Sequence, residues 1–366
     1  MIITVNKKEL GESVQIVARF AEKKSASLPA LAGIMILGSD SGIRLRATNL
    51  ETSIEVTLSG EVKDGGVVVL PAGTFREITS SFSGEGQVTL EHSGEVVTIH
   101  SGGAKSTLKT LSSEDFPYGG SPDKSKEKFS LSGVVLKTLI SSVSSCASTS
   151  SIRPELACVL LRAEGGQLRA VATDSFRLCE KRISDVAKLP PFSILIPAKN
   201  ALDIAQTLPD LDIDVVIDDH VAAFSWKNGL VSTRLVNVSY PDYVQIIPKS
   251  FVSEATVLRK DFEGALRRVA VFSDAFLKVR VSFSGKDKKL TLFARNTDVG
   301  EASESIAGAV TGEDIELSFN HRYLHSPLPL FPSESITISA SGIGRPLVIR
   351  GVGDTSLLYL VMPMNQ

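Results

Sequence analysis

The sequence predicts an α+β fold made of three tandem copies of one module, each with two helices and an antiparallel sheet. With 366 residues, the chain exceeds the size at which a single hydrophobic core usually stops growing. Segments of similar character begin at Leu45, Leu168 and Leu290, so the repeat is about 122 residues long. Each copy also opens with an amphipathic stretch and closes with a strand that a proline follows. These observations favour a repeated domain over one large core.

Apolar residues at helical spacing predict the first helix of each copy. The stripes are Leu10, Val14, Val17 and Ala21 in the first copy, Val135, Leu139 and Val143 in the second, and Phe262, Ala265, Leu266 and Val269 in the third.

Strand landmarks keep the same phase in all three copies. LRATNLETSIEV, LRAVATDSFRLCEKRI and LTLFARNTDVGEASESI mark corresponding positions in the three copies. A strand then leads into a second helix near Pro71, near Pro197 and in DIELSFNHRYL. We expect Pro327 and Pro329 to end or kink the last of these helices early. The closing strands precede Pro117, Pro241 and Pro363, and VTLEHSGEVVTIHS predicts a further antiparallel hairpin.

Two polar joints predict the domain boundaries. Residues 119–128 are rich in Gly, Ser and Lys, and residues 248–254 form a second short joint. We therefore expect domains at 1–118, 129–247 and 254–366.

The composition is that of an ordinary soluble protein, with 43% hydrophobic and 22% charged residues. The 39 basic and 41 acidic residues nearly cancel, which excludes a protein that grips nucleic acid by overall charge. Three scattered cysteines fit neither a disulfide framework nor a zinc site. No signal-peptide core or membrane-spanning stretch is evident, so we expect a cytoplasmic location.

Repeats of this kind can close into a ring. If each module lines the inside with two helices about 10 Å wide, one chain encloses a hole of roughly 9 Å. Two chains joined head to tail enclose roughly 28 Å, which passes duplex DNA about 20 Å across. The sequence therefore predicts a six-domain ring formed by a head-to-tail dimer.

Basic residues on or near the predicted helices are candidates for facing such a channel, where many weak phosphate contacts would permit sliding. A solvated helix face explains such residues as well. The candidates are Lys23, Lys24, Arg76, Arg153, Lys199 and Arg267.

The residues give little sign of catalysis. His321 and His325 have the spacing of metal ligands but lack a third ligand, and surface histidines explain them better. Asp218 to His220 fits a turn, and Cys158 and Cys179 fit buried strand positions. We predict no catalytic residue, metal or cofactor. The alternatives are an enzyme with its site between the repeats and a scaffold that binds peptides but never DNA.

Three motifs carry a resemblance to a known family. ATDSFRL at 172–178, YPDY at 240–243 and YLVMPM at 359–364 resemble the β subunit of bacterial DNA polymerase III, in register over essentially the full chain. The resemblance implies a homodimeric sliding clamp that encircles double-stranded DNA without reading its sequence. It also implies no catalytic activity, no cofactor and no membrane, with polymerase III, other polymerases, the clamp loader and repair proteins as partners.

The resemblance further implies a cleft for partner peptides between the second and third domains. Its methionines would suit many partners because they repack easily, although these residues could also be ordinary core. The implied cleft residues are Leu156, Thr173, Ser175, Phe176, Arg177, Leu178, Pro241, Ile246, Leu360, Met362, Pro363 and Met364.

It implies a dimer seam as well, formed by edge strands, an apolar cluster and ion pairs. Phe272 could equally be the last buried position of its helix. The seam residues are Lys105, Leu108, Val271, Phe272, Glu301 and Glu304.

The chain departs from the family where it has Phe176 in place of a frequent histidine and Gln245 in place of the usual arginine. It also ends in Asn365 and Gln366 where a basic and an apolar residue are usual. These differences leave its peptide preference open.

Overall fold

A computed structural model describes residues 1–23, 28–117, 122, 128–184, 186 and 189–364. The predictions for Lys24, for most of the joint at 119–128 and for the last two residues lie outside this part of the chain. The chain forms two compact units, Met1–Lys137 with Lys199–Asn237 and Thr138–Ala198 with Val238–Gln366, called unit 1 and unit 2 below.

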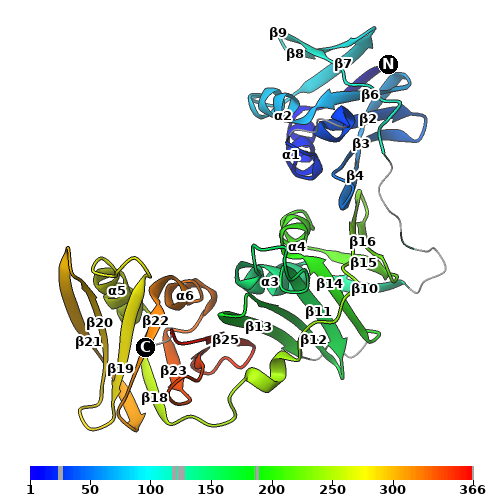
Figure 1. Cartoon of the computed structure of the whole chain (residues 1–366). Coiled ribbons are helices and arrows are strands. Elements are labelled where there is room, and N and C mark those ends of the chain that lie inside the picture. The colour runs from blue at the N-terminus through cyan, green and yellow to red at the C-terminus, as the bar shows by residue number, and fades with distance from the viewer. Residues whose placement is uncertain (24–27, 118–121, 123–127, 185, 187–188, 365–366) are drawn as a thin grey trace. The chain divides into compact units, whose positions relative to one another are not determined.

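The first copy of the module runs from β1 to β9 (Figure 1). Its elements are β1 (Ile2–Asn6), α1 (Lys7–Val17), the 3-10 helices η1 (Ala18–Phe20) and η2 (Pro29–Ala32), β2 (Gly33–Ser39), β3 (Gly42–Thr48), β4 (Thr52–Leu58), β5 (Gly60–Asp64), β6 (Gly66–Pro71), α2 (Ala72–Ser80), β7 (Gln87–Ser93), β8 (Val96–Ser101) and β9 (Ala104–Lys109).

The second copy runs from β10 to β17, and a short 3-10 helix follows it. Its elements are β10 (Lys128–Ser132), α3 (Gly133–Val143), η3 (Ser144–Cys146), β11 (Cys158–Glu164), β12 (Gln167–Thr173), β13 (Arg177–Ser184), β14 (Phe192–Pro197), α4 (Ala198–Ala205), β15 (Asp212–Ile217), β16 (Val221–Trp226), β17 (Gly229–Arg234) and η4 (Tyr243–Ile246).

The third copy runs from β18 to β25. Its elements are β18 (Ser253–Leu258), α5 (Arg259–Ala270), β19 (Lys278–Ser284), β20 (Lys289–Asn296), β21 (Gly300–Gly312), β22 (Ile315–Asn320), α6 (His321–His325), η5 (Leu328–Leu330), β23 (Ser335–Ala340), β24 (Leu347–Gly351) and β25 (Leu357–Val361). All three copies follow one order of strand, helix, strands, helix and three strands, which confirms the predicted repeat.

Each unit is built on extended sheets. Unit 1 holds a five-stranded sheet in the order β5-β1-β7-β8-β9 and an eight-stranded sheet in the order β10-β15-β16-β17-β4-β3-β2-β6. Unit 2 holds a twelve-stranded sheet in the order β14-β11-β12-β13-β25-β24-β23-β18-β21-β20-β19-β22. Antiparallel pairing of β4 with β17 joins the first two copies, and that of β13 with β25 joins the last two.

The predicted helical stripes are largely confirmed. Asn6 caps α1 by accepting bonds from two backbone N–H groups, and the apolar face of this helix is buried. All four predicted residues of α5 are buried. Two details were wrong: Ala21 lies beyond its helix, and Val135 is half-buried because Leu136 and Ile140 complete the buried face of α3.

The short predicted elements are confirmed too. Helix α6 ends at His325, and prolines shape the 3-10 turn after it, as their missing N–H groups require. Strands β7 and β8 form the predicted hairpin. No described helix combines the length and the apolarity that a bilayer-spanning helix needs.

Candidate functional site

The turn between β12 and β13 presents Phe176 to solvent. Thr173 Oγ1 donates to the Arg177 carbonyl at 2.7 Å, and Asp174 Oδ1 accepts from the N–H groups of Phe176 and Arg177, each at 3.0 Å. Ser175 has a backbone φ of 77°, a left-handed conformation that residues other than glycine rarely adopt. These bonds fix the turn and leave the Phe176 side chain 61% exposed.

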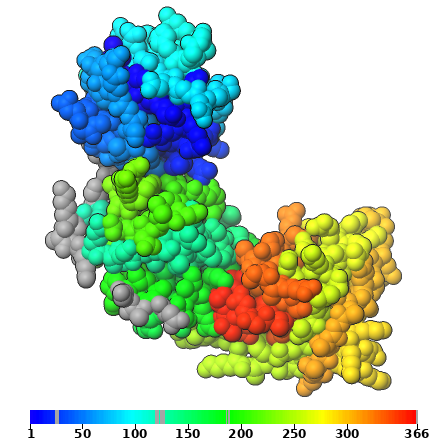
Figure 2. Space-filling model, turned by 180° about the vertical axis from the view of Figure 1, so that it is seen from behind, coloured from blue at the N-terminus to red at the C-terminus, as the bar shows by residue number. Residues whose placement is uncertain are grey.

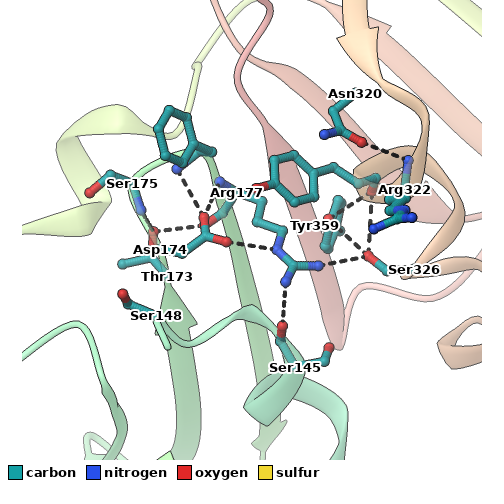
Figure 3. A network of polar contacts seen from close by, with 12 residues as sticks. Ser145, Ser148, Thr173, Asp174, Ser175, Arg177, Asn320, Arg322, Ser326 and Tyr359 are labelled. Carbon is teal, nitrogen blue, oxygen red and sulfur yellow. Dashed lines mark hydrogen bonds and ion pairs between the residues drawn. The ribbon is translucent and has the colours of Figure 1, made fainter. Parts of the chain in front are cut away.

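Arg177 ties this turn to two other segments of unit 2 (Figure 3). Its guanidinium donates to Asp174 Oδ2 at 2.9 Å, to the Ser145 carbonyl at 2.6 Å and to Ser326 Oγ at 3.1 Å. Its carbon Cζ also lies 4.7 Å from the centre of the Tyr323 ring. Arg177 therefore holds β13, η3 and α6 together, in addition to the peptide contact predicted for it.

The C-terminal segment completes this surface. Leu178 and Leu360 face each other across the β13–β25 pair, and both are buried. Beyond β25, the Met362 N–H donates to the Phe176 carbonyl at 2.7 Å, and the Met364 N–H donates to a carbonyl of β22 at 2.8 Å. The red C-terminal segment reaches the surface in Figure 2.

Tyr243 anchors the segment that carries Pro241 and Ile246. Its hydroxyl donates to the carboxylate of Glu180 on β13 at 2.6 Å, a buried bond. Burial and this bond raise the pKa of Tyr243, so the hydroxyl stays protonated and keeps donating. The motif YPDY marked this segment, but the partner on β13 could not be found from the sequence.

The predicted cleft residues differ in how far they reach the surface. Leu156, Thr173, Leu178 and Leu360 are buried, Arg177, Pro241, Met362, Pro363 and Met364 are half-buried, and Ser175, Phe176 and Ile246 are exposed. The structure thus brings the turn and the C-terminal segment together over an apolar base. The exposed and half-buried members are the ones that a peptide could touch.

Three of the predicted DNA-facing residues line one hollow of unit 1. Lys23, Arg76 and Lys199 are exposed around a cavity of about 900 Å³, together with Arg19. Acidic residues share this wall, and burial raises the pKa of Asp203 there. The hollow is therefore lined by both basic and acidic side chains, and the basic ones are the longer.

The other two described candidates for DNA contact belong to unit 2. Arg153 pairs with Glu155 at 2.9 Å, and Arg267 pairs with Glu263 at 3.3 Å. Both arginine side chains are more than half exposed, so these surface pairs contribute little to stability and could exchange for phosphate.

The predicted seam residues lie on or next to strands that have an unpaired edge within the described residues. Lys105 and Leu108 lie on β9, which pairs there with β8 alone. Glu301 and Glu304 lie on the first part of β21, where residues 300–307 pair with β20 and the opposite edge has no partner in the described part of the chain.

Val271 and Phe272 follow α5 next to that edge. Val271 is 68% exposed, while Phe272 is half-buried close to Gly300. Arg268 on the same helix chelates the Glu304 carboxylate at 2.5 and 2.6 Å, and this bond lowers the pKa of Glu304. Sequence reasoning missed Arg268 as the intrachain partner of a predicted seam residue.

The histidines considered as metal ligands lie on α6. His325 lies 3.6 Å from the Glu263 carboxylate, and burial lowers the pKa of His321. No group of three or more His, Cys, Asp or Glu side chains placed to hold a metal occurs within the described residues. Asp218 accepts bonds from the N–H groups of His220 and Val221, both at 2.7 Å, which confirms the predicted turn.

Comparison with known proteins yields the same picture over the whole chain. Models of the N-terminal, central and C-terminal domains of the DNA polymerase III beta subunit match residues 1–119, 130–242 and 244–365. The beta sliding clamp of Bacillus subtilis is 28% identical, and the alignment covers 100% of both chains.

Two solved structures share the fold. The DNA polymerase III beta subunit of Thermotoga maritima superposes with a TM-score of 0.93 at 23% identity, over 100% of both chains. A sliding clamp from Pseudomonas aeruginosa bound to griselimycin superposes with a TM-score of 0.92 at 25% identity, also over 100% of both chains.

Proposed function

The chain belongs to the DNA polymerase III beta subunit family, and we propose from this that it is a sliding clamp. Two copies form a ring around duplex DNA in the cytoplasm. The ring holds polymerase III, other polymerases, the clamp loader and repair proteins through the cleft in unit 2, and it catalyses no reaction itself. The proposed domains are 1–118, 129–247 and 254–366.

One feature of the strand pairing carries the ring proposal. The second strand of the LRA-type hairpin in one copy pairs with the closing strand of the next copy, as β4 does with β17 and β13 with β25. In the third copy the corresponding strand is β21, and its edge at 300–307 is free within the described chain. Among the described strands, β9 is the closing strand left over, and it too has one edge without a partner there.

A second molecule of the protein can satisfy both free edges at once. Pairing β21 of one molecule with β9 of the other repeats a junction already made twice within the chain, and two such contacts close a head-to-tail dimer. An unpaired edge is otherwise a template for aggregation. The repeat thus supports a dimer independently of the estimate of ring size.

The in-chain junctions also specify the register. Thr233 lies opposite Thr52, and Val361 lies opposite Arg177. With the same register at the proposed dimer junction, Leu108 of one molecule would lie opposite Gly300 of the other, and Thr107 opposite Glu301. Lys105 and Lys109 then flank Glu301 diagonally, which complements its charge.

The register can be tested by cross-linking. Thr107 and Glu301 correspond to Ser232 and Ser53, whose hydroxyls lie 2.7 Å apart. The double variant Thr107→Cys/Glu301→Cys should therefore give a covalent dimer under mild oxidation. As a matched control, Thr107→Cys/Ser303→Cys shifts one partner by two positions and should cross-link far less.

Topological retention tests the function itself. The ring should stay on a closed circular duplex and slide off the same duplex after it is cut once, because no base contacts hold it. Equal loss from both would show that the protein is not a clamp, and cross-linking without retention would reduce it to a dimeric scaffold. If both DNAs retain it equally and raised salt removes it from both, it is an ordinary DNA-binding protein.

A sliding clamp from Pseudomonas aeruginosa binds griselimycin, and we propose that this chain would bind the compound in the cleft of unit 2, which makes it a probe of that cleft. Titration calorimetry of the whole protein should detect its binding. Lack of binding at high micromolar concentration would leave ring formation intact but contradict the assignment of the cleft.

A further inference from the structure

One carboxylate in unit 2 faces three basic side chains. Glu263 lies on α5, and helix α6 lies beside α5 (Figure 1). The carboxylate is 4.0 Å from the guanidinium of Arg259, 3.3 Å from that of Arg267 and 3.6 Å from Nε2 of His325. The two arginines stand four residues before and four residues after Glu263, so all three side chains share one face of the helix.

Two of these neighbours hold the carboxylate close to the helices. The Arg259 side chain is 23% exposed, and its Nε also donates to the Ser333 carbonyl at 3.3 Å. His325 approaches Glu263 from the end of α6. The Glu263 side chain itself is 24% exposed. The carboxylate therefore stays near the protein surface, within reach of Arg267.

Arg267 is the member of this group that extends into solvent. Its side chain is 73% exposed, far more than that of Arg259 or Glu263. Within the described residues Glu263 is its ion-pair partner, and the acid precedes the base along the helix, which is the more favourable order. An exposed pair of this kind is weak and opens readily. Glu263 thus competes for Arg267 with any anion that arrives from solvent.

The hollow of unit 1 shows a similar arrangement. Lys199 and Asp203 are four residues apart on α4, and Lys199 opposes the rise in pKa that burial causes at Asp203. Arg19 also opposes that rise, and it donates to the side-chain carbonyl of Gln206 at 2.9 Å. In both units, a basic residue predicted to face DNA stands beside a carboxylate that already attracts it.

We propose that Glu263 is a positioning residue that limits how strongly Arg267 binds the phosphates of DNA. A phosphate must displace the Glu263 carboxylate before it can pair with Arg267, so the contact gains little and is released easily. Sliding requires many weak and equivalent contacts, because a phosphate that is held firmly slows movement along the duplex. The proposal rests on the proposed function, which brings α5 to the DNA.

Binding of the native full chain to a short linear duplex tests the proposal. Glu263→Gln removes the charge and keeps the shape of the side chain, so the affinity should rise about two- to fivefold at low salt, the value of a surface ion pair. The salt dependence should steepen by about one released counterion for each arginine that is freed. The anisotropy of a fluorescent duplex, measured over a range of salt concentrations, gives both quantities.

Asp261→Asn is the matched control for net charge. It removes one negative charge from the same helix, but Asp261 forms no ion pair with Arg267. The affinity of this variant should rise by clearly less than that of Glu263→Gln. Equal gains would mean that net charge sets the effect and position does not, which would overturn the proposal.

A double-mutant cycle with Arg267→Ala shows whether the effect passes through Arg267. Alone, this change should lower the affinity by less than about twofold because the arginine is restrained. In the Glu263→Gln background it should remove the whole gain. A gain that persists without Arg267, or a large loss from Arg267→Ala alone, would contradict the role of Glu263. The melting temperature of each variant checks that it is folded.

Retention of the parent protein on circular DNA separates this proposal from the proposed function. If the parent stays on circles and Glu263→Gln binds the linear duplex as the parent does, Glu263 has no such role and the clamp stands. If the parent is lost equally from circular and linear DNA, the protein is not a clamp and the role of Glu263 in sliding falls with it.

Discussion

The two junctions between copies share a backbone and differ in side chains. At the β4–β17 junction of unit 1, Thr48 Oγ1 donates to the Thr52 carbonyl at 2.8 Å, and the Arg234 N–H donates to the Glu51 carbonyl at 2.8 Å. At the β13–β25 junction of unit 2, the equivalent bonds measure 2.7 Å and 2.7 Å. Leu50 and Ser175 even share a left-handed φ, of 71° and 77°.

The side chains on this common backbone give the two junctions different chemistry. Glu51 stands where unit 2 has Phe176, and Arg234 stands where it has Met362. A charged pair of positions attracts water and ions, whereas an aromatic ring and a methionine fit apolar anchors. The comparison teaches that the repeat supplies the geometry of the junction and individual substitutions supply its binding properties.

The largest expected effect tests how burial sets the contribution of a leucine to each junction. Leu178→Ala leaves a cavity between β13 and β25 and should cost about 2–5 kcal/mol of stability, measured by chemical denaturation of unit 2. Leu230→Ala on β17 removes a side chain that is 39% exposed and should cost less than about 1 kcal/mol. Equal losses would contradict the burial assigned to the two positions.

The next effect concerns the difference in binding. Met362→Ala should weaken griselimycin binding about tenfold or more, because truncation of an apolar contact in a binding site typically costs about 1–3 kcal/mol. The matched change Arg234→Ala at the other junction should leave binding unchanged. Retention on circular DNA should survive both changes. Unchanged binding by Met362→Ala would argue against the cleft.

A third prediction extends the comparison to the proposed junction between the two molecules of the dimer. Phe272→Ala should weaken dimerisation about tenfold, since the phenyl ring of Phe272 would pack against the other molecule of the dimer. Sedimentation over a range of concentrations would detect this change. Leu50→Ala removes an exposed side chain of unit 1 and serves as the control. If Phe272→Ala unfolds its domain and leaves association intact, Phe272 is a core residue and the seam assignment is wrong.

The last prediction tests the shared backbone itself. Thr48→Val and Thr173→Val each remove a hydroxyl that donates to one backbone carbonyl and accepts from one N–H group. Each should cost about 1–3 kcal/mol, because buried polar groups lose their partners. The two losses should agree within error. A much larger loss at Thr173 would mean that the junctions are not equivalent in energy.

Local pattern was enough for much of the fold. Helices α1 and α5 follow from spaced apolar residues, the end of α6 follows from Pro327, and the hairpin of β7 and β8 follows from alternation around a Ser-Gly turn. Each of these depends on forces between residues close in sequence, such as helical spacing and fixed proline geometry.

The candidate site was only partly predictable. The motif ATDSFRL marked the turn, but the partners of Arg177 come from η3 and α6, far along the chain. Likewise, nothing in the sequence showed that Leu178 and Leu360 lie beneath the surface while Phe176 projects from it. Which apolar residues are buried is decided only when the strands pair and one face of the sheet is covered.

The sequence by itself determined a thrice-repeated α+β module, its landmarks and its family, because repetition and hydrophobic period are written along the chain. Only the tertiary structure decided which strand edges remain free within the described residues and which side chains reach the surface. These properties depend on contacts between residues far apart in the chain, such as Arg177 and Val361, because strand register and burial are not encoded in the local sequence.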